Sequence, residues 1–204
     1  MSVVVQTSAT NRRLTTVAAL KAELDVTTGA DDAYLAALVD QASNAVHDWC
    51  GRAFAVETVR ETIELPIANP SILPARWPLV AVVSATADGG AFDIADVESD
   101  DGACLAYRLD EDGERLDWPA GELVITYQAG YALPGEPGRT LPHAVERAAL
   151  ILAKGYAAAR GRDPLIRSET VEGAGSTDYF AGTVSDLPPE VEALLTHYRK
   201  LSYG

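Results

Sequence analysis

Histidine, the residue type that most often carries metal or acid–base chemistry, occurs three times in this chain, as His47, His143 and His197. Each falls in a different segment of helical periodicity, so no two histidines share one helix face. A zinc site needs several ligands that converge on one point. We therefore interpret the three histidines as surface or helix-end residues rather than as metal ligands.

Three further patterns resemble sites of chemistry but lack their defining residues. Asp31 and Asp32 form a carboxylate pair, yet they directly precede a helical segment, where helix capping explains them. Residues 110–113 (Asp-Glu-Asp-Gly) lack the full acidic repeat and the final Glu of a calcium loop. Residues 173–176 (Gly-Ala-Gly-Ser) lack the Gly-Lys-Ser/Thr ending of a phosphate loop. The sequence thus predicts no enzyme and no cofactor, and an unfamiliar carboxylate site stays the enzymatic alternative.

One local cluster of positive charge stands out, at Arg160, Arg162 and Arg167. It is either a solvated face or a contact for a partner's acidic surface, and the sequence favours neither. The Gly-, Ser- and Thr-rich segment 161–187 that contains most of it is long for a compact domain, which is typical of segments ordered by a partner. The candidate partner-binding residues are accordingly Arg160, Arg162, Arg167, Ser168, Glu169, Tyr179 and Phe180.

Composition excludes several functional classes. The 204 residues carry a formal net charge of −14, which argues against a protein that grips nucleic acid phosphates but permits one that DNA passes without sticking. No segment has the length and apolarity of a membrane span, and residues 1–13 have no signal-peptide core, so we expect a soluble, intracellular protein. Cys50 and Cys104 form no CxxC pair; two reduced thiols are expected, and a disulfide between them stays open.

Two helices are predicted near the N-terminus, over residues 14–24 and 31–50. The second has a capping acid before it, Gly51 at its C-terminal end and one apolar stripe. If that stripe is core, Trp49→Ala costs about 3–5 kcal/mol. The predicted core residues are Leu35, Leu38, Val39, Val46 and Trp49.

The middle of the chain, residues 54–130, has β-like character. Five or six short runs rich in Val, Ile and Thr are separated by turn signals such as Asp88-Gly89-Gly90. The spacing predicts a mostly antiparallel sheet or a small barrel-like module.

Two more helices are predicted after residue 131, from Pro142 to about residue 160 and from Pro188 to about residue 201. The fold class is therefore α+β: a small helical bundle formed by N- and C-terminal helix pairs, with an inserted antiparallel β module. The expected organisation begins with a flexible N-terminal arm (1–13) and the N-terminal helix pair of the bundle (14–53). The β module (54–130) follows, and then the C-terminal helix pair (131–204) with the long loop 161–187.

A set of short motifs in fixed order spans nearly the whole chain. They are Leu14-Thr15-Thr16, Trp49-Cys50-Gly51-Arg52, Arg76-Trp77-Pro78-Leu79, Trp118-Pro119-Ala120-Gly121, Ala129-Gly130-Tyr131, Leu141-Pro142, Gly161-Arg162-Asp163-Pro164 and Leu187-Pro188-Pro189-Glu190-Val191. In order and spacing this sequence resembles the head–tail connector (adaptor) proteins of tailed bacteriophages and of related gene transfer particles.

The resemblance implies a structural virion protein without catalytic residues or cofactor. It implies a homo-oligomeric ring of about a dozen copies beneath the portal protein, contacting a downstream stopper or tail protein while DNA passes through. It further implies a place in the virion neck after synthesis in the cytoplasm of a bacterial host. The alternative is another virion structural protein, a stopper or tail terminator.

Overall fold

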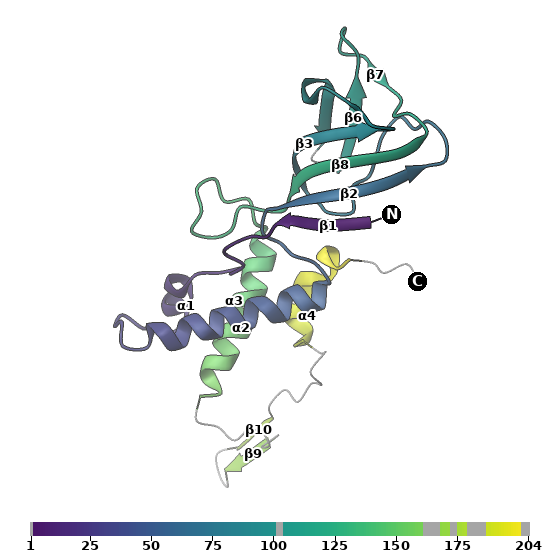
Figure 1. Ribbon diagram of the computed structural model, residues 1–204. Helices are drawn as coiled ribbons and strands as arrows, with labels where there is room; N and C mark the ends of the chain where they lie inside the picture. The colour runs from purple at the N-terminus through teal and green to yellow at the C-terminus, as the bar shows by residue number, and fades with distance from the viewer. Residues whose placement is uncertain (1, 101–103, 161–167, 172–174, 179–186, 201–204) are drawn as a thin grey trace. The chain divides into compact units, whose positions relative to one another are not determined.

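The computed structural model describes residues 2–100, 104–160, 168–171, 175–178 and 187–200. The chain folds as two compact units (Figure 1). One, the β unit, contains residues 1–11 and 54–132; the other, the helical unit, contains residues 12–53 and 133–204. The described helices and antiparallel sheets confirm the predicted α+β class.

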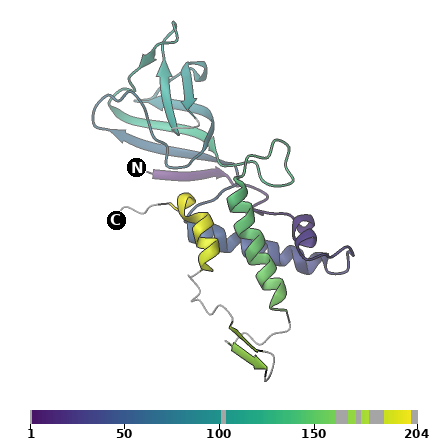
Figure 2. The same ribbon diagram turned by 180° about the vertical axis from the view of Figure 1, so that it is seen from behind.

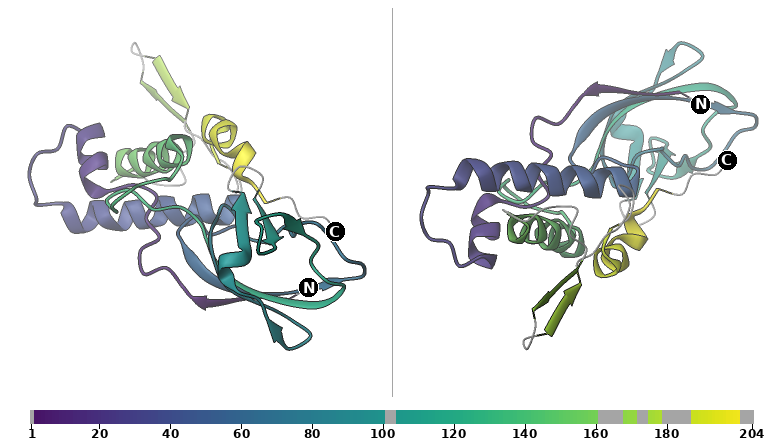
Figure 3. Two further views of the ribbon diagram at one scale, coloured as in Figure 1. Left: turned by 90° about the horizontal axis from the view of Figure 1, so that it is seen from above. Right: turned by 90° about the horizontal axis from the view of Figure 1, so that it is seen from below.

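The helical unit is built from segments on both sides of the β unit in the sequence. Its elements are α1 (Val17–Glu23), α2 (Asp32–Cys50), α3 (His143–Ala158), α4 (Pro189–Leu195) and the single 3₁₀ turn η2 (Thr196–Tyr198). Helix α3 crosses α2 and also packs against α4, as Figures 2 and 3 show. The two helices nearest the N-terminus thus bury their apolar faces with helices from the far end of the chain.

Local signals set the helix ends. Thr16 caps α1, because its Oγ1 accepts a hydrogen bond from the Ala19 amide at 3.1 Å. Gly51 ends α2 in the left-handed conformation, with φ of 64°, as predicted. Asp31 occupies the N-cap position of α2 but makes no side-chain capping bond there.

The predicted core stripe of α2 is only partly correct. Leu35, Leu38, Val39 and Val46 are buried, whereas Trp49 is only partly buried. Trp49 lies in the last turn of α2, where its ring stacks beneath the Arg199 guanidinium at 5.1 Å from the ring centre. The large cost predicted for Trp49→Ala is therefore too high, because that cost applies to a fully buried ring.

The β unit contains two antiparallel sheets. The larger has the order β1 (Ser2–Thr7), β2 (Glu57–Leu65), β8 (Gly121–Ala129), β3 (Leu79–Ala87) and β4 (Gly90–Ala91). The smaller has the order β5 (Val97–Asp100), β6 (Leu105–Leu109) and β7 (Arg115–Leu116), with the 3₁₀ turn η1 (Ile94–Asp96) before it. Inward-facing residues alternate along β8, so Leu123, Ile125 and Tyr127 are fully buried.

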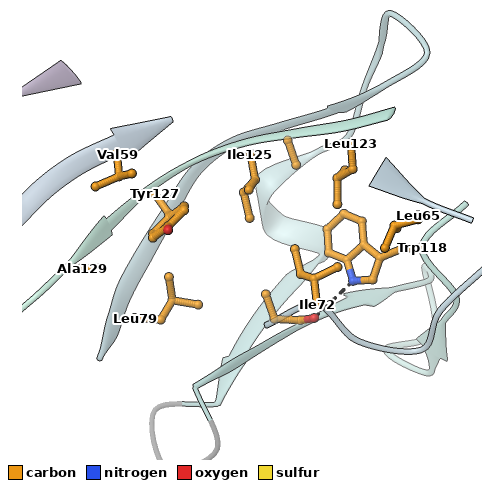
Figure 4. Packing of buried hydrophobic residues seen from close by; sticks show 11 residues of the cluster. Val59, Leu65, Ile72, Leu79, Trp118, Leu123, Ile125, Tyr127 and Ala129 are labelled. Carbon is orange, nitrogen blue, oxygen red and sulfur yellow. Dashed lines mark hydrogen bonds between the residues drawn. The ribbon is translucent and has the colours of Figure 1, made fainter. Parts of the chain in front are cut away.

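Trp118 is the largest side chain of the β-unit core (Figure 4). Its indole N–H donates to the Ala106 carbonyl at 3.1 Å, which satisfies the one polar atom of the ring. Phe92 meets it edge to face, with ring centres 5.6 Å apart. Trp118 therefore joins the small sheet, through Ala106, to the core side of the large one.

Two expectations about irregular segments need correction. Ser2–Thr7, expected as part of a flexible arm, form β1 and pair with β2 in antiparallel register, with Val4 opposite Arg60. The expected long loop 161–187 contains a hairpin of β9 (Ser168–Val171) and β10 (Gly175–Asp178). Strand β1 depends on pairing with β2, which lies far along the chain, so the pattern within residues 1–13 does not identify it.

Candidate partner-binding site

The structure places a subset of the predicted partner-binding residues. Arg160 lies just after α3, and Ser168 and Glu169 open β9, opposite Asp178 and Thr177 of β10. Four members of the set lie outside the described residues: Arg162, Arg167, Tyr179 and Phe180.

Arg160 is exposed and held by two groups from the start of α2. Its guanidinium donates to Asp31 Oδ1 at 2.9 Å and lies over the Tyr34 ring, 4.4 Å from the ring centre. The hydrogen bond to Asp31 raises the pKa of Arg160 above its ordinary value. Because both side chains of the ion pair are about half exposed, water screens their attraction and a partner's carboxylate could exchange with Asp31.

A second charged cluster joins α1 to α3. The Glu23 carboxylate accepts hydrogen bonds from Arg147 and, at 3.4 Å, from Lys154. The bond from Arg147 chiefly lowers the pKa of Glu23, so this carboxylate stays ionised. Arg147 and Lys154 are thus paired within the helical unit, as Arg160 is.

His47 corrects another expectation. It is at a helix end, as predicted, but it is 5% exposed rather than on the surface. Its ring nitrogens lie 3.0 Å from the Arg12 carbonyl and 3.2 Å from the Arg52 carbonyl. Burial lowers the pKa of His47, which favours the neutral ring; a neutral ring has one N–H and donates to only one of these two carbonyl oxygens at a time.

The β unit contains a buried polar cluster that sequence reasoning missed. Glu61 is fully buried on the core side of β2, where its Oε2 accepts hydrogen bonds from the Tyr127 hydroxyl at 2.6 Å and from the Ala75 amide at 2.9 Å. The Tyr127 hydroxyl in turn accepts from the Arg76 amide at 3.2 Å, and the Arg76 side chain reaches Glu57 at 3.3 Å.

This cluster fixes the segment before β3 to the sheet, so it positions backbone rather than a ligand. A signal was available in the sequence. Glu57 and Glu61 are in phase with the apolar Val59, which places all three on the same face of a strand.

Exposed apolar side chains gather on the β unit. Val3 and Val4 lie on β1, Val80 and Val83 on β3, and Ile67 and Leu73 on the segment between β2 and β3. Their exposed fractions range from 39% for Val3 to 70% for Ile67. Single exposed valines are ordinary on a protein surface. Here Val3 and Val4 form one pair at one end of the large sheet, and Val80 and Val83 form a second pair towards the other end, so each pair is a candidate contact surface.

Among the described residues, no group of three or more His, Cys, Asp or Glu is placed to hold a metal ion. Within the same residues, no helix combines the length and apolarity needed to span a bilayer. Neither of the described cysteines, Cys50 and Cys104, is part of a disulfide in the structure.

A model of the family described as head completion protein matches residues 13–201. The chain belongs to the head completion protein family. The family match confirms the resemblance to phage head–tail connectors that was inferred from the order of the sequence motifs. A comparison with curated protein sequences finds no match.

Solved structures similar in fold to this family member come from particle necks and virions. One is a chain in the neck of an empty GTA particle computed with C6 symmetry, at TM-score 0.55 and 19% identity. Another is a chain in the virion of the native gene transfer agent (GTA) particle, at TM-score 0.54 and 17% identity. A third is a chain in the neck of the native GTA particle computed with C12 symmetry, at TM-score 0.50 and 17% identity. Each match covers 100% of this chain and 99% of the other, so the two-unit fold is shared over its full length.

Proposed function

We propose that this protein is a structural component of the virion neck: a head–tail adaptor. In this role, copies of the chain form a ring beneath the portal protein. The ring extends the DNA channel and presents a surface to the next head-completion or tail protein. The observation that carries the proposal is the head completion family match over residues 13–201.

Two further observations support it. Similar chains come from structures described as the neck of a GTA particle, computed with C6 and with C12 symmetry, as expected for a ring protein. The chain's charge also suits the role. With 30 acidic and 16 basic side chains it repels DNA on average, so a channel lined by it would not hold the DNA in passage.

The proposed contact with the portal or with the downstream protein centres on Arg160 and the segment that follows it. Arg160 is exposed and its partner Asp31 is half exposed, so an acidic surface can replace Asp31 at little cost. Arg162, Arg167, Ser168, Glu169, Tyr179 and Phe180 complete this proposed contact set.

Electron microscopy of the protein with and without its portal ring tests the adaptor role. A ring of the chain coaxial with the portal is the expected result. Absence of any ring, alone or with the portal, over a wide range of protein concentration would overturn the proposal. Binding to the isolated tail assembly but not to the portal would instead identify a tail terminator.

Arg160→Glu tests the contact set, and Arg115→Glu is a matched control. Arg115 is also a half-exposed arginine with the same two kinds of partner. Its guanidinium lies 3.1 Å from the Glu98 carboxylate and sits over the Tyr107 ring, 3.6 Å from the ring centre. Arg160→Glu should weaken portal or tail-protein binding, while Arg115→Glu should leave it unchanged. Equal behaviour of the two variants would remove Arg160 from the contact set.

A further inference from the structure

Strand β1 has the composition of a buried strand but an edge position. It contains neither a charged side chain nor a proline, and the uncharged stretch continues from Met1 to Asn11 in a chain where 23% of residues are charged. Edge strands of stable monomers usually carry lysine, proline or inward-pointing charge, because these block pairing with another chain. Strand β1 has none of these three, and its one irregularity is a register shift between Val5 and Thr7 near its end.

Within the described residues of the β unit, no strand pairs with the outer side of β1. The strand pairs with β2 on one side and ends the sheet order on the other. Val4 is 56% exposed and Val3 is 39% exposed, and the backbone along this side has no hydrogen-bond partner among the residues that the structure describes. An open, apolar, uncharged edge of this kind is a template for a further strand.

The opposite end of the same sheet is similar in character. The terminal strand β4 pairs only with Thr86 and Ala87, and the Phe92 amide donates to the Ala85 carbonyl at 2.9 Å, so only the part of β3 before Ala85 has no such partner among the described residues. Residues 77–87 carry no charge. Register shifts near Val80 and Val83 mark these residues as bulges, and they are 48% and 49% exposed.

We infer that β1 of one copy of this chain packs against β3 of the next copy, so that sheets of neighbouring subunits join edge to edge. The inference rests on the proposed ring and names its subunit contact. A ring needs two different surfaces of each subunit to meet head to tail, and the two ends of one sheet provide them.

The charge of the chain favours a second copy as the occupant. Copies with a net charge of −14 repel one another, and surface that is free of charge lets them meet without bringing like charges together. Val3 with Val4 at one end, and Val80 with Val83 at the other, are apolar pairs on such surface. Joining them buries four exposed valines per contact without bringing like charges together.

Thiol cross-linking in a background of Cys50→Ala and Cys104→Ser tests the geometry. Val4→Cys and Val83→Cys are small changes at exposed sites and should leave the fold intact. With a short bis-maleimide, a mixture of the two single variants should give covalent dimers, and the double variant should give a ladder of multimers. Each single variant alone should stay monomeric on a denaturing gel.

Other outcomes of the cross-linking overturn the inference. Dimers from Val4→Cys alone would mean that β1 pairs with β1 in a two-fold contact, which cannot propagate around a ring. Rings that are visible by microscopy but give no ladder would remove this contact and leave the proposed adaptor function standing. Absence of rings under every condition would overturn the function as well.

Charge substitution provides an independent measurement. Val4→Lys should raise the protein concentration needed for assembly about tenfold or more, because it places an unpaired charge in an apolar contact. Val83→Glu should have a similar effect alone and should restore assembly when combined with Val4→Lys. Ile67→Lys, at an exposed isoleucine that belongs to neither strand, is the control and should assemble normally. Unchanged assembly of the Val4→Lys variant would refute the contact.

Discussion

Tyr127→Phe is the most direct test of the buried cluster in the β unit. The substitution removes one hydroxyl and keeps the ring, which is fully buried between the other core side chains of β8 (Figure 4). Glu61 Oε2 then keeps only the Ala75 amide, and the other oxygen of Glu61 already has no hydrogen-bond partner. The Arg76 amide loses its acceptor at the same time.

The expected cost follows from these contacts. A hydrogen bond to a charged acceptor contributes about 1.5–3 kcal/mol, and an unsatisfied buried carboxylate oxygen stands at the upper end of that range. We therefore expect Tyr127→Phe to lower the unfolding free energy of the β unit by about 2–3 kcal/mol. Burial raises the pKa of Tyr127, so the hydroxyl remains a donor throughout the ordinary pH range.

Denaturant unfolding followed by tryptophan fluorescence is the assay. In a Trp49→Phe background the remaining tryptophans, Trp77 and Trp118, both lie in the β unit, so the signal reports on that unit alone. Tyr107→Phe is the matched control, because the Tyr107 hydroxyl makes no hydrogen bond within the described residues. The control should change the unfolding free energy by less than about 0.5 kcal/mol.

A double-mutant cycle decides whether the hydrogen bond is the cause. Glu61→Gln keeps the shape of the side chain and removes its charge. Because Tyr127 and Glu61 are in direct contact, their effects should be non-additive by about 1 kcal/mol or more. A cost for Tyr127→Phe equal to that of the control, or additive effects in the cycle, would refute the reasoning.

Three further predictions use denaturant unfolding, followed by tryptophan fluorescence for the β unit and by far-ultraviolet circular dichroism, which reports on helix content, for the helical unit. Trp118→Ala should lower the unfolding free energy of the β unit by about 3–5 kcal/mol, because the ring is fully buried. Trp49→Ala, at a partly exposed ring, should lower that of the helical unit by about 1–2 kcal/mol. Equal costs would contradict the difference in burial between the two rings. Gly130→Ala should lower the unfolding free energy by about 3 kcal/mol or more, because a Cβ on this residue, whose φ is 130°, would lie 2.3 Å from the Ala55 carbonyl oxygen. Gly113→Ala is the control: its φ is also positive, but its Cβ would meet no atom, so it should cost about 1 kcal/mol. Burial lowers the pKa of His47, so as the pH falls the histidine of the unfolded chain takes up a proton before the folded one does. The stability of the helical unit should therefore be full above about pH 6.5 and should fall as the pH drops below that value. His47→Gln should flatten this dependence of stability on pH, and an unchanged dependence would exclude His47 as its origin.

Local patterns were sufficient to place the four helices of this chain but not all of their ends, since the last helix was predicted to run to about residue 201 and α4 ends at Leu195. The cap at Thr16 and the left-handed Gly51 depend on backbone geometry within a few residues, so they could be predicted from sequence. Periodicity correctly placed Leu35, Leu38, Val39 and Val46 of the α2 stripe in the core. It failed at Trp49, because burial in a last helical turn depends on which neighbouring element covers it.

The candidate site was less accessible to sequence reasoning. Arg160 was identified as a potential contact, but its pairing with Asp31 joins residues far apart in the chain. Strand β1 was expected as a flexible arm, since nothing within its six residues shows that Ser2–Thr7 would pair with β2. The burial of Glu61 could be inferred weakly from the sequence, because Glu61 lies on the same strand face as the apolar Val59. What stabilises the buried carboxylate is the pair of hydrogen bonds from the Tyr127 hydroxyl and the Ala75 amide, which only the tertiary structure brings together.

By itself, the sequence determined the α+β class, the presence and order of the four helices, the acidic charge that disfavours gripping DNA, and the motifs that mark the family. These depend on local propensity, composition and order, which are fully present in the linear chain. The tertiary structure decided which apolar residues remain exposed, that β1 forms an edge of the sheet, and how Glu61 and Arg160 are satisfied. These depend on contacts between residues distant in sequence, whose pairing is selected by the packing of the whole unit.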